Sequence, residues 1–139
     1  MTITATSQTL FDGERIAIMK FYTSMSTTEN ESAVAKVTPS ALNPSAAGGA
    51  CDAVTILKCT AMTHGLEVQM LWKANTPVPI QIIPPNTNYT QDYSDFGGLW
   101  NNAGTGKDGV ITFTTFDGSA GDAYTVILTM QKHYVNPLA

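Results

Sequence analysis

The sequence predicts an all-β protein, a single antiparallel β-sandwich of the jelly-roll type with an extended N-terminal arm. About eight short segments rich in β-branched and aromatic residues are separated by turn signals, and no stretch shows the period of an amphipathic helix. Only 13% of the 139 residues are charged, and Thr, Ser and Asn supply most of the polarity. Short strands separated by regular turns are typical of sandwiches and jelly rolls. We find no domain boundary and expect one domain over residues 1–139.

The first half of the chain predicts an edge element followed by three strands. Residues 1–11 are rich in Thr and Ser and alternate loosely, which indicates an N-terminal arm or an edge strand. Asp12-Gly13 then predicts a turn. Residues 26–50 form a variable loop region interrupted by one short strand, and its polar, acidic start, residues 26–32, is expected to be exposed. The expected strands cover residues 15–24, 33–37 and 52–61.

The expected strand at 52–61 is followed by a break at Thr63-His64-Gly65. In this strand Val54, Ile56 and Lys58 should face one way. The residues expected on the opposite face are Ala53, Thr55, Leu57 and Cys59.

The second half of the chain predicts four more strands. Leu66, Val68, Met70 and Trp72 alternate with polar neighbours and are expected to face the core. Prolines surround and interrupt residues 78–83, and because proline cannot donate to a β-ladder this strand should lie at a sheet edge. We expect a polar connection at 86–94 and a glycine-containing link that joins the last two strands as an antiparallel pair. The expected strands cover residues 66–72, 78–83, 110–116 and 123–132.

Residues 95–109 contain five of the chain's 11 glycines, next to the aromatic residues Phe96 and Trp100. Glycine adopts positive φ angles and allows close backbone approach, so this density predicts a loop with a fixed path. Trp72 is expected in the core. Trp100 is the better surface candidate, and we interpret it as part of a protein interface in preference to a sugar-stacking platform.

The composition argues against several classes of partner. The formal net charge is −4 and the seven basic residues are scattered, so no nucleic-acid partner is expected. No signal peptide and no apolar run long enough to span a bilayer is visible, so no membrane partner is expected. Cys51 and Cys59 are interpreted as two buried or half-buried thiols of a protein made in a reducing cytosol.

The sequence offers no catalytic site, no metal site and no cofactor site. His64 and His133 stand alone, without the spacing of a zinc site. Residues 104–107, Gly-Thr-Gly-Lys, lack the first glycine and the hydroxyl of a phosphate loop and precede a strand. Residues 117–122 hold too few carboxylates for a calcium loop. We therefore expect a protein that is not an enzyme.

Three stretches carry a resemblance to a known group of proteins: residues 65–74 (GLEVQMLWKA), 96–111 (FGGLWNNAGTGKDGVI) and 124–132 (YTVILTMQK). Together they resemble small virion structural proteins of tailed phages of cyanobacteria and marine bacteria, and within that group capsid cement, or decoration, proteins. The similarity covers roughly residues 65–132 and also the start, where Asp12-Gly13 and Arg15 precede the first long strand.

The resemblance implies a protein made in the host cytoplasm that binds the outer surface of the virion capsid. Its partners would be the major capsid protein and further copies of itself in a homotrimer. We expect residues 1–11 to make the intersubunit or capsid contact by β-augmentation, and residues 100–106 to shape a second contact surface. The interface candidates are Ile3, Thr4, Ala5, Thr6, Leu10, Phe11, Phe96, Trp100, Asn101 and Asn102. Two alternatives stay open: another virion component, such as a head-fibre base, tail or adaptor protein, and a carbohydrate-binding module.

Overall fold

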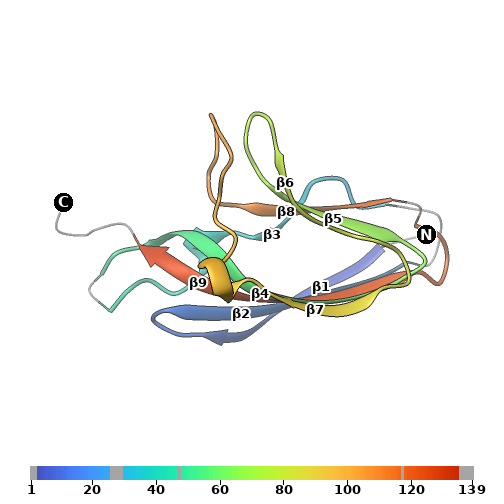
Figure 1. The fold of residues 1–139 in the computed structure, drawn as a ribbon, viewed down its shortest axis with the longest axis horizontal. Coiled ribbons are helices and arrows are strands. Elements are labelled where there is room, and N and C mark those ends of the chain that lie inside the picture. Colours follow the sequence, from blue (N-terminus) through green and yellow to red (C-terminus); the bar gives the residue numbers. More distant parts are fainter. Residues whose placement is uncertain (1–2, 26–29, 47, 117, 135–139) are drawn as a thin grey trace.

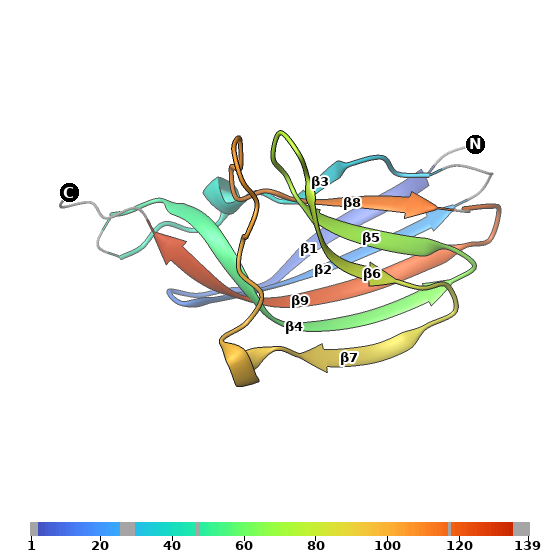
Figure 2. The ribbon, with the colours of Figure 1, turned by 45° about the horizontal axis from the view of Figure 1, so that its top comes forward.

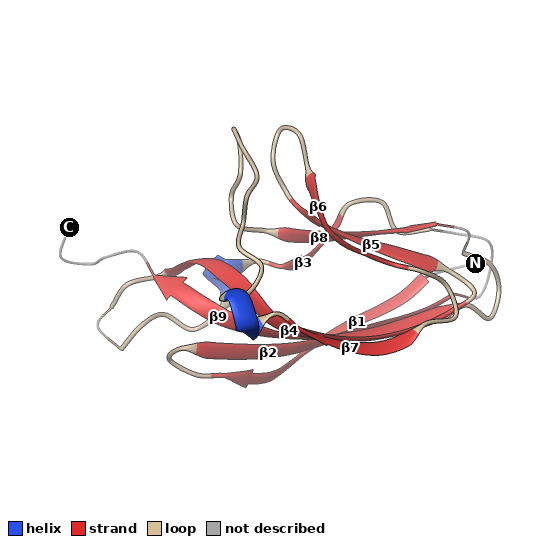
Figure 3. Cartoon of the chain, in the orientation of Figure 1, coloured by secondary structure: helices blue, strands red, loops and turns tan. Residues whose placement is uncertain are grey.

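The computed structural model describes residues 3–25, 30–46, 48–116 and 118–134, with the backbone alone at residues 3–5. Strands dominate these ranges, and the two helical segments within them are short 3-10 turns, η1 (Pro39–Ala41) and η2 (Ser94–Phe96) (Figure 3). None of the helices in the described ranges could cross a membrane. The strands are β1 (Ile3–Asp12), β2 (Ile16–Met25), β3 (Val34–Val37), β4 (Cys51–His64), β5 (Glu67–Trp72), β6 (Val78–Ile83), β7 (Asn88–Asp92), β8 (Ile111–Phe116) and β9 (Ala123–Tyr134).

The strands form two antiparallel sheets, which Figures 1 and 2 show as two stacked layers. The larger sheet has the order β1-β2-β9-β4-β7 and the smaller one the order β3-β8-β5-β6. The strands from β2 to β9 are distributed between the layers in the order of a jelly roll, with β5 and β6 adjacent in the smaller sheet, and β1 is added outside β2. The predicted jelly-roll sandwich is therefore confirmed.

The N-terminal segment is an edge strand whose backbone is already paired on one side. β1 runs antiparallel to β2 along its length, with a bulge between Thr9 and Phe11. Of the two alternatives that the sequence leaves open, an arm or an edge strand, the structure shows the edge strand. Met1 and Thr2 lie outside the described residues.

The predicted alternation of β5 is confirmed, since Val68, Met70, Trp72 and the preceding Leu66 are all buried. The smaller sheet also places β6 at its edge, as its prolines predict.

β4 does not keep one alternation along its length. Val54 and Ile56 are buried, but a bulge between Ile56 and Lys58 shifts the register, and beyond it Cys59 and Ala61 are the buried residues. A bulge inserts one residue and so exchanges the two faces of the strand. The predicted faces are therefore correct before the bulge and wrong after it. The strand also continues through His64, where a break was expected.

Two further predictions about the connections are wrong. The polar stretch 86–94 contains strand β7, which pairs with β4. Its residues are mostly exposed because it is an edge strand, so no alternation of apolar residues announces it. β8 and β9 do not pair with each other: β8 lies between β3 and β5, and β9 lies between β2 and β4. The short link between them crosses from one layer to the other.

The core fills the space between the layers. The rings of Phe21 on β2 and Phe113 on β8 meet edge-on, with centroids 5.4 Å apart. The ring of Phe113 also packs against that of Tyr124 on β9, with the ring centroids 5.9 Å apart. These contacts join the two sheets through their inner faces.

Residues 26–32 are predicted to form an exposed loop, but Glu31 within this stretch is buried. Glu31 accepts hydrogen bonds from Lys36 at 2.6 Å and from the Tyr124 hydroxyl at 2.5 Å, and Glu31 and Lys36 are both buried. Burial of these charges is tolerated because each one is paired. The exposed-loop prediction is therefore wrong at Glu31, while residues 26–29 lie outside the described residues.

Candidate functional site

The glycine-rich loop has a fixed path, as its composition predicts. Gly97 and Gly98 have φ angles of 90° and 93°, which side chains rarely adopt. Leu99 then forms an isolated bridge with Ile56, with N–H···O distances of 2.8 and 3.0 Å in the two directions. A Cβ atom at Gly98 would lie 2.6 Å from the Thr55 methyl group and 2.9 Å from the Ile56 carbonyl oxygen. The loop therefore extends the β4 edge beyond β7 and leaves no room for a larger residue at position 98.

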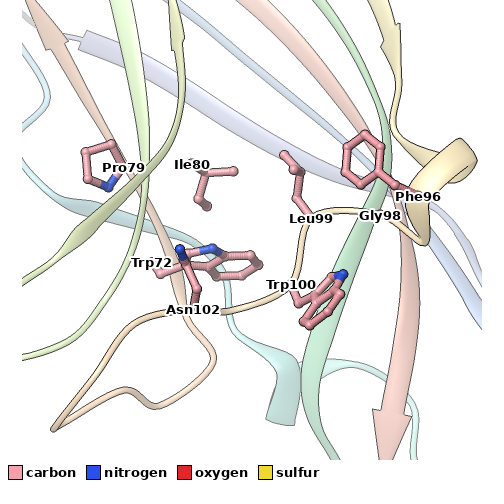
Figure 4. Close-up of a pocket in the computed structure, with 8 residues that line it drawn as sticks. All are labelled: Trp72, Pro79, Ile80, Phe96, Gly98, Leu99, Trp100 and Asn102. Carbon is pink, nitrogen blue, oxygen red and sulfur yellow. The ribbon is translucent and has the colours of Figure 1, made fainter.

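This loop presents two exposed aromatic residues. Phe96 is 61% exposed and Trp100 is 68% exposed, whereas Trp72 is 1% exposed. Both predictions about the tryptophans' exposure are thus confirmed. A shallow pocket of about 300 Å³ lies between the loop and β6, and Figure 4 shows the side chains that line it. Its lining consists mainly of apolar side chains: Trp72, Pro79, Ile80, Phe96, Leu99 and Trp100.

Trp100 also borders a second hollow, which contains several polar side chains. This hollow, of about 410 Å³, is lined by Asp52, Thr55, Asn101 and His133, among other residues. The Thr55 Oγ1 and the His133 Nε2 lie 2.7 Å apart and form a hydrogen bond. Trp100 therefore lines both hollows.

The β1 edge is the second candidate surface. Leu10 is 52% exposed and Phe11 is 53% exposed, and residues 7–9 are exposed as well. Since β2 occupies one side of β1, the other side offers an unpaired row of backbone N–H and C=O groups. No charged residue precedes Asp12 in this strand.

The structure does not bring all the predicted interface residues together. Thr6, Leu10 and Phe11 lie on β1, at one edge of the larger sheet. Phe96, Trp100, Asn101 and Asn102 lie on the loop that follows β7, at the opposite edge. The side chains of Ile3, Thr4 and Ala5 lie outside the described residues. The two predicted surfaces are therefore separate.

Sequence reasoning missed the residues that surround Trp100. Asp52 and Thr55 come from β4, and Gln131 and His133 come from β9; Thr55 and His133 are 78 positions apart in the chain. The only local sign of these residues in the sequence is that they are polar positions on strands, and such positions are equally common on ordinary protein surface.

The reactive groups in the described part of the chain are dispersed. No three His, Cys, Asp or Glu residues gather closely enough there to hold a metal ion. Cys51 and Cys59 are free and buried, as predicted. Burial raises the pKa of the Cys59 thiol to about 12, which keeps it protonated at neutral pH.

The comparisons with known proteins place no function on this site. No family model matches the sequence, and no curated protein matches it at a significant level. Among solved structures, the chain is similar to a family 29 carbohydrate-binding module in a mutant form, at 10% identity and a TM-score of 0.36. That match covers 98% of this chain and 100% of the module. A score this low carries no argument about fold or ligand.

Proposed function

We propose that this chain is a non-enzymatic structural protein of a phage virion, a capsid cement protein that binds the outer surface of the head and joins neighbouring major capsid subunits. The resemblance over residues 65–132 is the reason for proposing the major capsid protein as the partner. The main structural observation in support of the proposal is the open edge of β1. In this proposal the protein is made in the host cytoplasm and acts as a homotrimer, so that several weak contacts add through avidity.

β1 is suited to bind a partner because the jelly roll is complete without it. The eight strands from β2 to β9 make up the two layers, and none of the described side chains of β1 belongs to the core. Ahead of Asp12, whose carboxylate pairs with Lys132, the strand is held mainly by its backbone pairing with β2. A strand that contributes so little to the core has a clear role if its outer edge pairs with a strand of another protein.

The other sheet edges are protected against such pairing. β6 contains Pro79, β3 has four residues and includes Lys36, and β7 has five residues and ends in Asp92. Proline, charge and short length are the usual devices that block edge-to-edge association. β1 alone among the four described edges is long and free of proline and of charge up to Asp12.

The mode of binding proposed is β-augmentation, in which main-chain hydrogen bonds supply affinity and side chains supply specificity. Leu10 and Phe11 add exposed apolar area at the end of the strand, next to the bulge. Apolar anchors of this kind contribute most when a partner covers them completely.

The test is removal of residues 1–11 followed by binding to capsids that lack this protein. The shortened chain should fold, because Asp12 remains and its hydrogen bond with Lys132, at 2.5 Å, is kept. It should no longer sediment with the shells. The full-length double variant Ser7→Lys and Thr9→Lys should also fail to bind, since both residues are exposed and charge protects an edge.

Two controls make the result interpretable. Circular dichroism and thermal unfolding of both variants should show a folded β protein. A matched double variant on the protected edge, Thr90→Lys and Gln91→Lys of β7, should bind shells as the unaltered protein does. If shells bind the shortened chain normally, β1 is not the capsid contact. A particle map that shows the protein on the tail would instead favour the alternative of another virion component.

A further inference from the structure

A groove beside Trp100 lies over β4 and β9 of the larger sheet, away from the β1 edge. It consists of two adjoining hollows, of about 410 and 370 Å³, which share Thr55, Trp100 and His133. Each volume falls within the range of small-molecule sites. We propose that this groove binds a neutral saccharide, with the Trp100 indole as its apolar wall. This inference goes beyond the proposed capsid function and does not rest on it.

Trp100 is exposed, and its backbone adjoins a bonded point of the loop. Its side chain makes no ring contact with any other described residue, although its backbone follows the Leu99–Ile56 bridge directly. An aromatic side chain on a held backbone offers a flat apolar face at little cost in conformational entropy. The C–H groups on one face of a pyranose ring pack well against such a face, whose π-system is electron-rich.

The floor of the groove offers hydrogen-bonding groups that both donate and accept. Thr55 and His133 orient each other through their 2.7 Å hydrogen bond. The Gln131 amide and the Asp52 carboxylate are exposed and form no hydrogen bond with another described residue. Hydroxyl groups of a sugar are both donors and acceptors, so a mixed set of this kind matches them.

The charges around the groove select against anionic ligands. Asp52, Asp108 and Lys107 line one hollow, and Lys73 pairs with Asp108 at 3.6 Å. The lining therefore has no excess of positive charge that would attract a phosphate, a sulfate or a uronic acid. A neutral, polyhydroxylated ligand suits this balance.

The backbone beneath the groove also selects against an extended peptide. β9 lies between β2 and β4, and the Ile56 N–H and C=O are bonded to Leu99. These main-chain groups are therefore not open to β-augmentation, the mode by which a peptide strand would bind a sheet. Recognition must come from side chains, as it does for a sugar. From the sequence alone, the surface around Trp100 is interpreted as a protein interface. We assign it instead to a saccharide.

The experiment uses the fluorescence of the full-length chain, which contains two tryptophans. Because Trp72 is buried and Trp100 is exposed, added ligand should change mainly the Trp100 signal. We would titrate with neutral glucans, mannans, xylan and oligosaccharides of N-acetylglucosamine. At least one should shift the emission to the blue in a saturable way, and saturation-transfer NMR should show its ring protons in contact with the protein.

Three single substitutions test whether the saccharide binds in the groove beside Trp100. Trp100→Ala should weaken saccharide binding, read by NMR, by about tenfold or more because the stacking face is lost. Gln131→Ala should weaken it by a smaller factor. Phe11→Ala removes an aromatic residue of similar exposure on β1 and should leave saccharide binding unchanged.

Three results would overturn the inference: no neutral saccharide binds at millimolar concentration, Trp100→Ala binds as well as the unaltered chain, or only anionic polysaccharides bind. Loss of shell binding by Trp100→Ala without any saccharide binding would assign the groove to a protein partner instead. The capsid proposal is tested separately from the saccharide proposal. Chains without residues 1–11 should lose shell binding and keep saccharide binding, so normal shell binding by these chains would contradict only the capsid proposal.

Discussion

The two edges of the larger sheet are built in different ways. β7 is short, but Tyr89 packs against the core and the Tyr93 hydroxyl donates a hydrogen bond to Gln81 on β6, at 2.7 Å, which ties this edge to the other layer. The following loop then continues the pairing through Leu99. β1 is twice as long and none of its described side chains reaches the core.

This difference shows that strand length does not measure a strand's contribution to stability. An edge that buries side chains is part of the folded unit, because burial of apolar area is the main stabilising term. An edge held by main-chain pairing alone contributes little net free energy, since water can replace its hydrogen bonds. Such an edge can be devoted to a partner, and the three predictions below test this division.

The largest effect is expected where the loop closes the β7 edge, at Gly98. Gly98→Val would place a β-branched residue at a φ of 93° and force its Cβ against Thr55 and the Ile56 carbonyl. We expect unfolding to become easier by about 3 kcal/mol or more, measured by urea denaturation. Gly104→Ala is the matched control, because nothing lies within 4 Å of its Cβ position and its stability should change by about 0.5 kcal/mol at most. Equal stabilities for the two variants would mean that the loop path is not fixed.

An intermediate effect should separate the two edges directly. Tyr89→Ala removes a half-buried ring from β7 and should cost about 2 kcal/mol of unfolding free energy. Phe11→Ala removes a ring from β1 and should change stability by about 0.5 kcal/mol or less, because that ring is already exposed. Tyr89→Phe controls for the hydroxyl, which is buried without a hydrogen-bond partner among the described residues, so its removal should not destabilise. A larger loss for Phe11→Ala than for Tyr89→Ala would contradict the comparison.

The smallest effect is a dependence of stability on alkaline pH to which Cys59 and Tyr89, on the β7 side, contribute. Burial raises the pKa of Cys59 from 9.0 to about 12, and burial, together with the nearby Cys59, raises that of Tyr89 from 10.0 to about 12. The unfolded chain releases these protons first, so the folded state binds more protons between pH 9.0 and about 12, and stability falls as pH rises through that range.

The measurement is the urea midpoint at neutral pH and at several values above 9.0. The slope with pH should become shallower in Cys59→Ala, because one of the titrating groups with a raised pKa is gone. Removal of residues 1–11 should leave the slope unchanged, since β1 lies at the far edge of the sheet. A slope that changes with β1 and not with Cys59 would place the sensitive groups elsewhere.

Most of the fold could be predicted from local patterns. β5 is the clearest case, because its alternating buried residues from Leu66 to Trp72 specify a strand and its inner face without any other part of the chain. β7 could not be found in this way, since an exposed edge strand of polar residues has the composition of a loop. The faces of β4 beyond Ile56 depend on a bulge, which the residue pattern does not encode.

The candidate sites were predictable only in part. Trp100 and the fixed loop path follow from a dense run of glycines beside an aromatic residue. The polar residues next to Trp100 come from β4 and β9, and only the folded chain brings them together.

The sequence by itself determined that this protein is a β-sandwich with a shaped glycine-rich loop, because side-chain alternation and positive-φ glycines act over a few residues. The tertiary structure alone decided the pairing of the N-terminal strand with β2, the crossing between β8 and β9, and the buried pair of Glu31 and Lys36. Each of these depends on contacts between segments distant in the chain or on packing of one layer against the other. Such contacts are chosen by the total burial of the fold and leave no mark on the local pattern.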